Sequence, residues 1–102
     1  MINNITLKII NDTAILTGEL TRQTVHLLSE YDSRSLLKQN MAKIDLAAVN
    51  KIDTAGLAWL LTQVELAQAN TCQLSFVHIP SGLIKLAELS SVDSFLPINL
   101  SS

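Results

Sequence analysis

The residues best placed to do chemistry in this chain are a carboxylate and a hydroxyl side by side, Asp53 and Thr54. They directly precede the stretch from Ala55 to Ala69, which is rich in Leu and Ala and free of proline, so we expect a helix there. A hydroxyl at this place can cap the helix by accepting a backbone N–H, and the carboxylate suits the positive helix end. Because a cap faces solvent, a binding partner can also contact it.

Two further features of this helix bear on partner binding. Gly56 costs the first turn roughly 1 kcal/mol relative to alanine, so either a partner or the chain's own sheet approaches the backbone closely there. With Leu57, Leu61 and Val64 as the core face, the opposite face is uncharged and includes the one tryptophan of the chain. That face consists of Ala55, Trp59, Thr62 and Leu66, flanked by Ala58 and Gln63. Such a composition is typical of an interface anchor, unless a neighbouring helix or the C-terminal segment covers it.

These features predict a partner-binding surface on one side of the helix. Its members are Asp53, Thr54, Ala55, Gly56, Trp59, Thr62 and Leu66. Three classes of partner remain open at this point: a different protein, a kinase that modifies Thr54, or a second copy of the chain packed on the Trp59 face.

Other kinds of site find little support in the sequence. His26, His78 and Cys72 lack the spacing of metal ligands. The glycines are far apart, so no phosphate-binding loop is present, and no nucleophile-elbow motif orients a serine. We therefore expect no catalytic residues, no metal and no cofactor. Asp45, in the middle of an expected strand, is interpreted as a carboxylate hydrogen-bonded to the next loop.

The elements that must position the predicted surface follow the order β-β-α-β-α-β-α. Strands are expected over residues 5–10 and 13–17, joined by a hairpin turn at Asn11-Asp12. Gly18 and Glu19 end the strand pattern. A helix follows with Thr21 as its N-cap and resumes over Leu36 and Leu37. A strand over 43–49, the helix over 55–69, a strand over 72–79, a helix over 83–90 introduced by Pro80-Ser81, and an edge segment over 95–98 complete the chain. This predicts one α/β domain over residues 1–102, with a mixed sheet of about four strands and helices mainly on one face.

Composition limits what such a domain can bind. The chain has 102 residues, of which 48% are hydrophobic and 16% charged, so apolar surface is expected to remain for a partner. The net charge of -2, without a basic cluster in the sequence, argues against nucleic acid and anionic membrane surfaces. No apolar stretch approaches the roughly 18 residues that span a bilayer, no secretory signal is visible, and the one cysteine suits a reducing compartment. We expect a soluble cytoplasmic protein.

Residues 44–61 read IDLAAVNKIDTAGLAWLL: a short strand holding an Asp, a brief loop, Asp-Thr-Ala-Gly-Leu, then a leucine-rich helix. This pattern resembles the signature of STAS domains, the family of anti-sigma factor antagonists and transporter-associated regulatory modules. The expected element order is similar to that fold over nearly the whole chain. Thr54 stands where anti-sigma factor antagonists have a phosphorylatable serine. The threonine, and Leu-Ala-Glu-Leu followed by Leu-Pro near the C-terminus, look more like the STAS subunits of Mla phospholipid-transport ABC complexes.

The resemblance implies a non-catalytic subunit that binds an MlaF-like ABC transporter ATPase through the helix starting at Thr54, and through it the permease. Such a subunit supports phospholipid transport that maintains outer-membrane lipid asymmetry, on the cytoplasmic side of the inner membrane, with no direct membrane insertion and no nucleic acid. The alternative is a phospho-switch, as in anti-sigma factor antagonists, because a phosphate on Thr54 adds about -2 charge beside Asp53 and against a docked partner.

Overall fold

A β-hairpin and two parallel strands form one mixed sheet in the computed structural model, which describes residues 4–30 and 33–97. The strands are β1 (Ile5–Ile10), β2 (Thr13–Leu20), β3 (Met41–Ile52) and β4 (Gln73–Val77), and this is also their order in space. β1 and β2 are antiparallel, whereas β3 is parallel to both β2 and β4. The predicted mixed α/β sheet is therefore confirmed.

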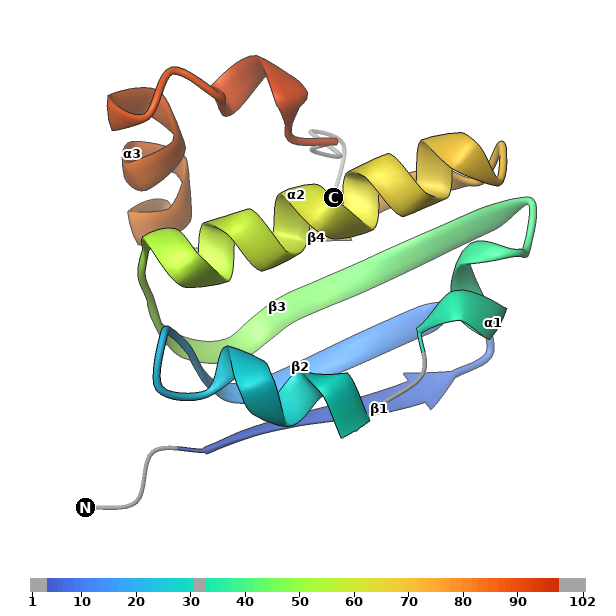
Figure 1. The fold of residues 1–102 in the computed structure, drawn as a ribbon, viewed down its shortest axis with the longest axis horizontal. Helices are drawn as coiled ribbons and strands as arrows, with labels where there is room; N and C mark the ends of the chain where they lie inside the picture. Colours follow the sequence, from blue (N-terminus) through green and yellow to red (C-terminus); the bar gives the residue numbers. More distant parts are fainter. Residues whose placement is uncertain (1–3, 31–32, 98–102) are drawn as a thin grey trace.

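The helical segments lie mainly on one face of this sheet (Figure 1). They are the 3-10 helix η1 (Val25–Glu30), α1 (Arg34–Leu37), α2 (Thr54–Ala69), α3 (Ser81–Leu89) and the 3-10 helix η2 (Asp93–Phe95). Alternation in the strands explains why one face is covered, because Ile5 and Leu7 of β1 are buried while Thr6 and Lys8 are exposed. The predicted arrangement of helices on one face is confirmed.

The hydrophobic core lies between the sheet and these helices. Its most deeply buried large side chains come from every layer of the fold and include Leu16, Leu20, Leu60, Phe76 and Leu83. The two layers approach each other closely at Gly56 in the first turn of α2, where a Cβ atom would collide with the carbonyl oxygen of Leu20. The close approach expected at Gly56 is therefore made by the chain's own sheet, which occupies the space beside this residue.

Several boundaries differ from those predicted. β2 does not end at Thr17, as predicted, but continues to Leu20, because Gly18 adopts φ +117° at an irregularity of the β2–β3 pairing. β3 extends from Met41 to Ile52, well beyond the predicted 43–49, because its first two residues pair with β4, and Lys51 and Ile52 pair with the extended end of β2. β4 covers only 73–77, which leaves Cys72, His78 and Ile79 outside the strand.

The predicted helix after Thr21 is the largest error in the element assignment. Thr21 is buried and caps no helix; its backbone N–H instead donates to the hydroxyl of Thr24, 2.9 Å away, in a tight turn. That hydroxyl in turn donates to the Glu19 carbonyl oxygen at 2.7 Å. The side chain–backbone bonds of Thr24 favour a turn, so the helical part is reduced to the 3-10 helix η1 and the four-residue α1.

The C-terminal segment returns to the sheet. Leu96 is buried, and the carbonyl oxygen of Pro97 accepts a hydrogen bond from the backbone N–H of Phe76 in β4, 2.8 Å away. This agrees with the edge segment predicted over 95–98, of which Ile98 lies outside the described residues. Within 4–30 and 33–97, no helix combines the length and apolar character that crossing a bilayer would require.

Replacing Gly56 by alanine tests the close approach of α2 to β2. Although alanine is the better helix former by about 1 kcal/mol, the added methyl group would force α2 away from the Leu20 carbonyl. We expect Gly56→Ala to lower the free energy of unfolding by about 1–3 kcal/mol in urea denaturation. Gly82→Ala in α3 is the matched control, because its added Cβ would meet nothing within 4 Å beyond the adjoining residues and backbone of its own helix. Equal effects of the two variants would contradict this account.

Candidate partner-binding site

The start of α2 is fixed by the Asp53 side chain, which is the N-cap of the helix. One carboxylate oxygen accepts from the backbone N–H of Gly56 at 3.1 Å, and the other accepts from the backbone N–H of Arg22 at 3.0 Å. Asp53 also donates its own N–H to the Leu20 carbonyl oxygen at 3.3 Å. One residue therefore ties the first turn of α2 to the segment that follows β2.

Opposing effects act on the pKa of the Asp53 carboxyl. Partial burial raises the pKa, but hydrogen bonds from the backbone N–H groups of Arg22, Gly56 and Ala55 lower it, as does the positive charge of Arg22. The net result is a pKa below the ordinary value of an aspartate. The carboxylate is thus ionised at neutral pH and committed to internal contacts.

Thr54 is the first residue of α2 and is exposed, so the prediction that its hydroxyl caps the helix is wrong. Asp53, one residue earlier, has the extended backbone of an N-cap and takes that role. Among the described residues, no hydrogen bond uses the Thr54 hydroxyl. The hydroxyl is therefore available to a molecule outside the chain.

The buried side of α2 is rotated by about a quarter turn from the predicted one, at 100° per residue. The buried residues are Gly56, Leu57, Leu60, Gln63 and Ala67. Leu61 and Val64, predicted to face the core, are only partly buried. Gln63, predicted beside the exposed face, is buried, where its side chain accepts from the Ser33 hydroxyl at 3.0 Å and donates to the Trp59 carbonyl oxygen at 3.4 Å.

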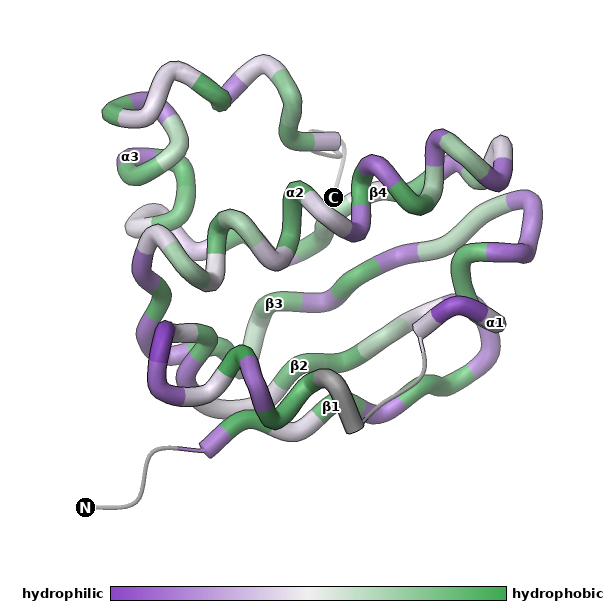
Figure 2. Tube along the Cα trace, in the orientation of Figure 1, coloured by the Kyte–Doolittle hydropathy of each residue, from purple (hydrophilic) through white to green (hydrophobic). Residues whose placement is uncertain are grey.

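The outer side of α2 is short of charge for a helix that faces solvent. Glu65 is the one charged residue among its sixteen, and Figure 2 shows no strongly hydrophilic position in the first half of the helix. We define the Thr54 face as Thr54, Ala55, Ala58, Trp59, Thr62 and Leu66. Of these, Thr54, Ala58, Thr62 and Leu66 are exposed. Thr54, Ala58 and Thr62 are small, which allows another backbone to approach closely, and Leu66 adds an exposed large apolar side chain.

Trp59 and Ala55 lie at the margin of this face and are partly buried. Trp59 packs against the hydrophobic core, so the chain covers part of this residue and leaves the rest exposed, and its role as an interface anchor stays a prediction. Of the other predicted members of the surface, Asp53 caps α2 and Gly56 packs against β2, and their contact with a partner stays a prediction.

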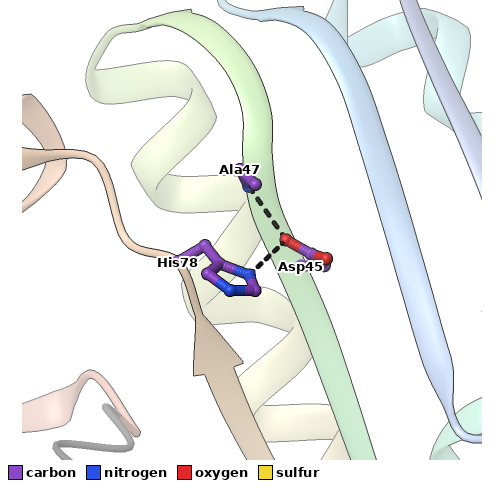
Figure 3. A network of polar contacts seen from close by, with 3 residues as sticks. All are labelled: Asp45, Ala47 and His78. Atoms are coloured by element: carbon purple, nitrogen blue, oxygen red, sulfur yellow. Dashed lines mark hydrogen bonds and ion pairs between the residues drawn. The ribbon is translucent and has the colours of Figure 1, made fainter. Parts of the chain in front are cut away.

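Asp45 and His78 form a polar pair away from α2 (Figure 3). One oxygen of Asp45 accepts from the backbone N–H of Ala47 at 2.9 Å and lies 3.0 Å from Nδ1 of His78, which follows β4. The carboxylate is hydrogen-bonded as expected, but to Ala47 within β3 and not to the next loop. His78, just after the neighbouring strand β4, is a second partner that sequence spacing did not indicate. Over the described ranges, the structure groups no three His, Cys, Asp or Glu side chains that could hold a metal ion.

A groove that sequence reasoning missed runs along the other flank of α2. It has a volume of about 330 Å³ and is lined by Leu61, Val64, Glu65, Gln68 and Phe95. The exposed Phe95, from η2, closes one side of it. The signal in the sequence was the Phe-Leu-Pro segment near the C-terminus, whose position against α2 depends on contacts distant in the chain.

Comparison with known proteins decides the family. The family model described as "Mlab, STAS domain" matches residues 11–98. The chain belongs to the MlaB-type STAS domain family. It is 32% identical over 78 residues to the "Intermembrane phospholipid transport system binding protein MlaB" of Escherichia coli. The aligned region covers 76% of this chain and 78% of that protein.

Solved structures agree with a STAS domain at the level of the fold. An anti-sigma factor antagonist, as it is described, from Thermotoga maritima superposes with a TM-score of 0.71 at 20% identity, covering 95% of this chain and 88% of the other. The anti-sigma factor antagonist SpoIIAA in its unphosphorylated form gives 0.62 at 13% identity, covering 93% and 87%. At identities this low, the superpositions show that the fold is shared and nothing more specific.

The pH dependence of stability tests the role of Asp53 in this STAS domain. Because the folded-state pKa lies below the unfolded value near 3.9, the carboxylate stabilises the native state above that pH. The stabilisation is lost as the pH falls through the folded-state pKa. We expect Asp53→Ala to lower the free energy of unfolding at neutral pH by about 0.5–2 kcal/mol.

In urea denaturation at several pH values, the difference between the wild type and Asp53→Ala should shrink below about pH 4. Asp53→Asn is the control, because it keeps a capping oxygen but has no proton to lose, so its stability curve should be flatter in that range. A difference between wild type and alanine variant that stays constant down to the lowest pH would refute this role.

Proposed function

We propose that the chain is a non-catalytic subunit of an ABC transporter and that it binds the ATPase subunit through the Thr54 face. Two lines support this. The E. coli relative is named as a binding protein of an intermembrane phospholipid transport system, and the outer side of α2 offers small, uncharged side chains where a solvent-facing helix ordinarily carries charge. The second observation carries the proposal, because it concerns this chain's own surface.

In this role the subunit sits on the cytoplasmic side of the inner membrane, held there by the ATPase and through it by the permease, and supports phospholipid transport that maintains outer-membrane lipid asymmetry. A rigid face is an advantage for such docking. Asp53 and Gly56 hold the first turn of α2 against β2, so the Thr54 face keeps one orientation before and after the partner binds.

Charged substitutions on the exposed part of the Thr54 face test the docking. Ala58→Glu and Thr62→Lys place charge where the proposed contact is driest, and we expect each to reduce co-purification with the cognate ATPase subunit at least about tenfold. Both residues are exposed, so the free energy of unfolding of the isolated chain should stay within about 0.5 kcal/mol of the wild-type value. Trp59 is less suitable, because it also packs against the core.

Thr17→Lys is the matched control for these variants, since Thr17 is exposed on the sheet face opposite the helices. Normal ATPase binding by Ala58→Glu and Thr62→Lys would exclude the Thr54 face as the docking surface.

A phospho-switch at Thr54 is the alternative function, because the Thr54 hydroxyl is exposed and not used in capping the helix. Substitutions of Thr54 distinguish it from a constitutive docking contact. For a constitutive docking contact, Thr54→Ser should bind the ATPase nearly as well as the wild type, whereas Thr54→Glu should bind at least about tenfold more weakly. Intact-mass measurement of the chain from its native cells should then show no added phosphate. A phosphate on Thr54 that rises and falls with ATPase binding would favour the switch.

A further inference from the structure

The fold gathers most of the basic residues of the chain at one end, where the β1–β2 hairpin turns. Residues 8–13 and 33–43 contain four of the seven Lys and Arg, namely Lys8, Arg34, Lys38 and Lys43, but one of the nine Asp and Glu, Asp12. Two hydrogen bonds join these segments. The Gln39 side chain donates to the Asn11 carbonyl oxygen at 3.4 Å, and the Lys43 backbone N–H donates to the Asp12 carbonyl oxygen at 2.8 Å. These segments carry a net charge of +3 and the rest of the chain -5.

Large apolar side chains are exposed at the same end. Ile10 is 46% exposed and Met41 is 56% exposed. In the sheet register, Ile10 pairs with Thr13 and Thr13 with Lys43, so the start of β3 lies beside the hairpin turn. We call this region, made of Lys8, Ile10, Lys38, Met41 and Lys43, the basic end.

We propose that the basic end adsorbs to the surface of a bilayer rich in anionic phospholipid. Exposed apolar side chains can enter the boundary between headgroups and acyl chains while neighbouring lysines extend their ammonium groups to the lipid phosphates. Lys8 and Lys38 are exposed, and neither forms an ion pair with any residue that the structure describes. Their charge is therefore available to the lipid.

The net charge of -2 argued against anionic membranes, but that argument holds for evenly spread charge. The molecule is 38 Å long, whereas salt screens charges beyond about 8 Å at physiological ionic strength. A membrane at the basic end therefore senses the lysines there more strongly than acidic residues at the far ends of β2 and β3, such as Glu19 and Asp53.

The basic end is also remote from the start of the Thr54 face. β3 runs from Met41 at the basic end to Ile52 beside Asp53 (Figure 1), and twelve residues of strand span roughly 36 Å. An adsorbed chain thus leaves the first turns of α2 free. The inference does not depend on the ATPase contact, and either can hold without the other.

Co-sedimentation of the full chain with vesicles tests the adsorption. At low salt we expect binding to vesicles of equal parts phosphatidylcholine and phosphatidylglycerol, little binding to phosphatidylcholine alone, and weakening as sodium chloride is raised. Lys8→Gln combined with Lys38→Gln should lower the partition coefficient about 25-fold, at about fivefold for each lysine. Ile10→Ser combined with Met41→Ser keeps the charge and should also weaken binding.

Lys51→Gln combined with Lys85→Gln is the matched control, because both lysines are exposed, lie outside the basic end and carry the same total charge. It should change the partition coefficient by less than about twofold. Absence of binding to the anionic vesicles at low salt, or equal losses in the two lysine pairs, would overturn the proposal. So would retention of the chain on immobilised polyglutamate without vesicle binding, which would assign the basic end to an acidic protein. Circular dichroism confirms that each variant is folded.

Discussion

The Asp53 carboxylate is the contact on which the geometry of this STAS domain depends most. It joins two backbone N–H groups that are far apart in the chain, those of Arg22 and Gly56, and so fixes where β3 stops and where α2 starts. Gly56 completes the junction by allowing the helix to press against the Leu20 carbonyl. Because a helix is rigid, an error at this junction would displace every residue along α2, including those farthest from it. The position of α2 and the exposure of Thr54 at its start therefore both depend on this junction.

This junction also separates the tasks of neighbouring residues. The Asp53 carboxylate is occupied with internal hydrogen bonds, and the Thr54 hydroxyl beside it has none among the residues described. Along the same helix, Gln63 satisfies its buried amide with Ser33 and Trp59, so the inner side of α2 tolerates a polar residue. Trp59 does not follow this separation, since it belongs to the edge of the core and to the Thr54 face together. Changes at Trp59 would therefore alter folding and binding in one step.

The sequence was informative wherever local patterning was strong. The alternation of Ile5, Thr6 and Leu7 predicted β1, and the Asp-Thr-Ala-Gly-Leu segment located the start of α2. It failed where two local choices were nearly equivalent. Asp53 and Thr54 are both good caps, and a helix with Leu and Ala on all sides has no unique core face. Tertiary packing, including the close approach of Gly56 to Leu20, decides that Leu60 is buried and Leu61 only partly so. The pair of Asp45 and His78 depended on strand register, which no single-sequence pattern reports.

The hydrogen bond from the Phe76 N–H to the Pro97 carbonyl has a consequence for solution behaviour. β4 is an edge strand, and a row of unpaired backbone groups on an edge strand can recruit a strand from another molecule. The returning segment occupies part of that row, and a proline within it cannot donate a hydrogen bond that would extend the pairing. The segment at Leu96 and Pro97 thus shortens the edge along which another copy of the chain could pair during synthesis.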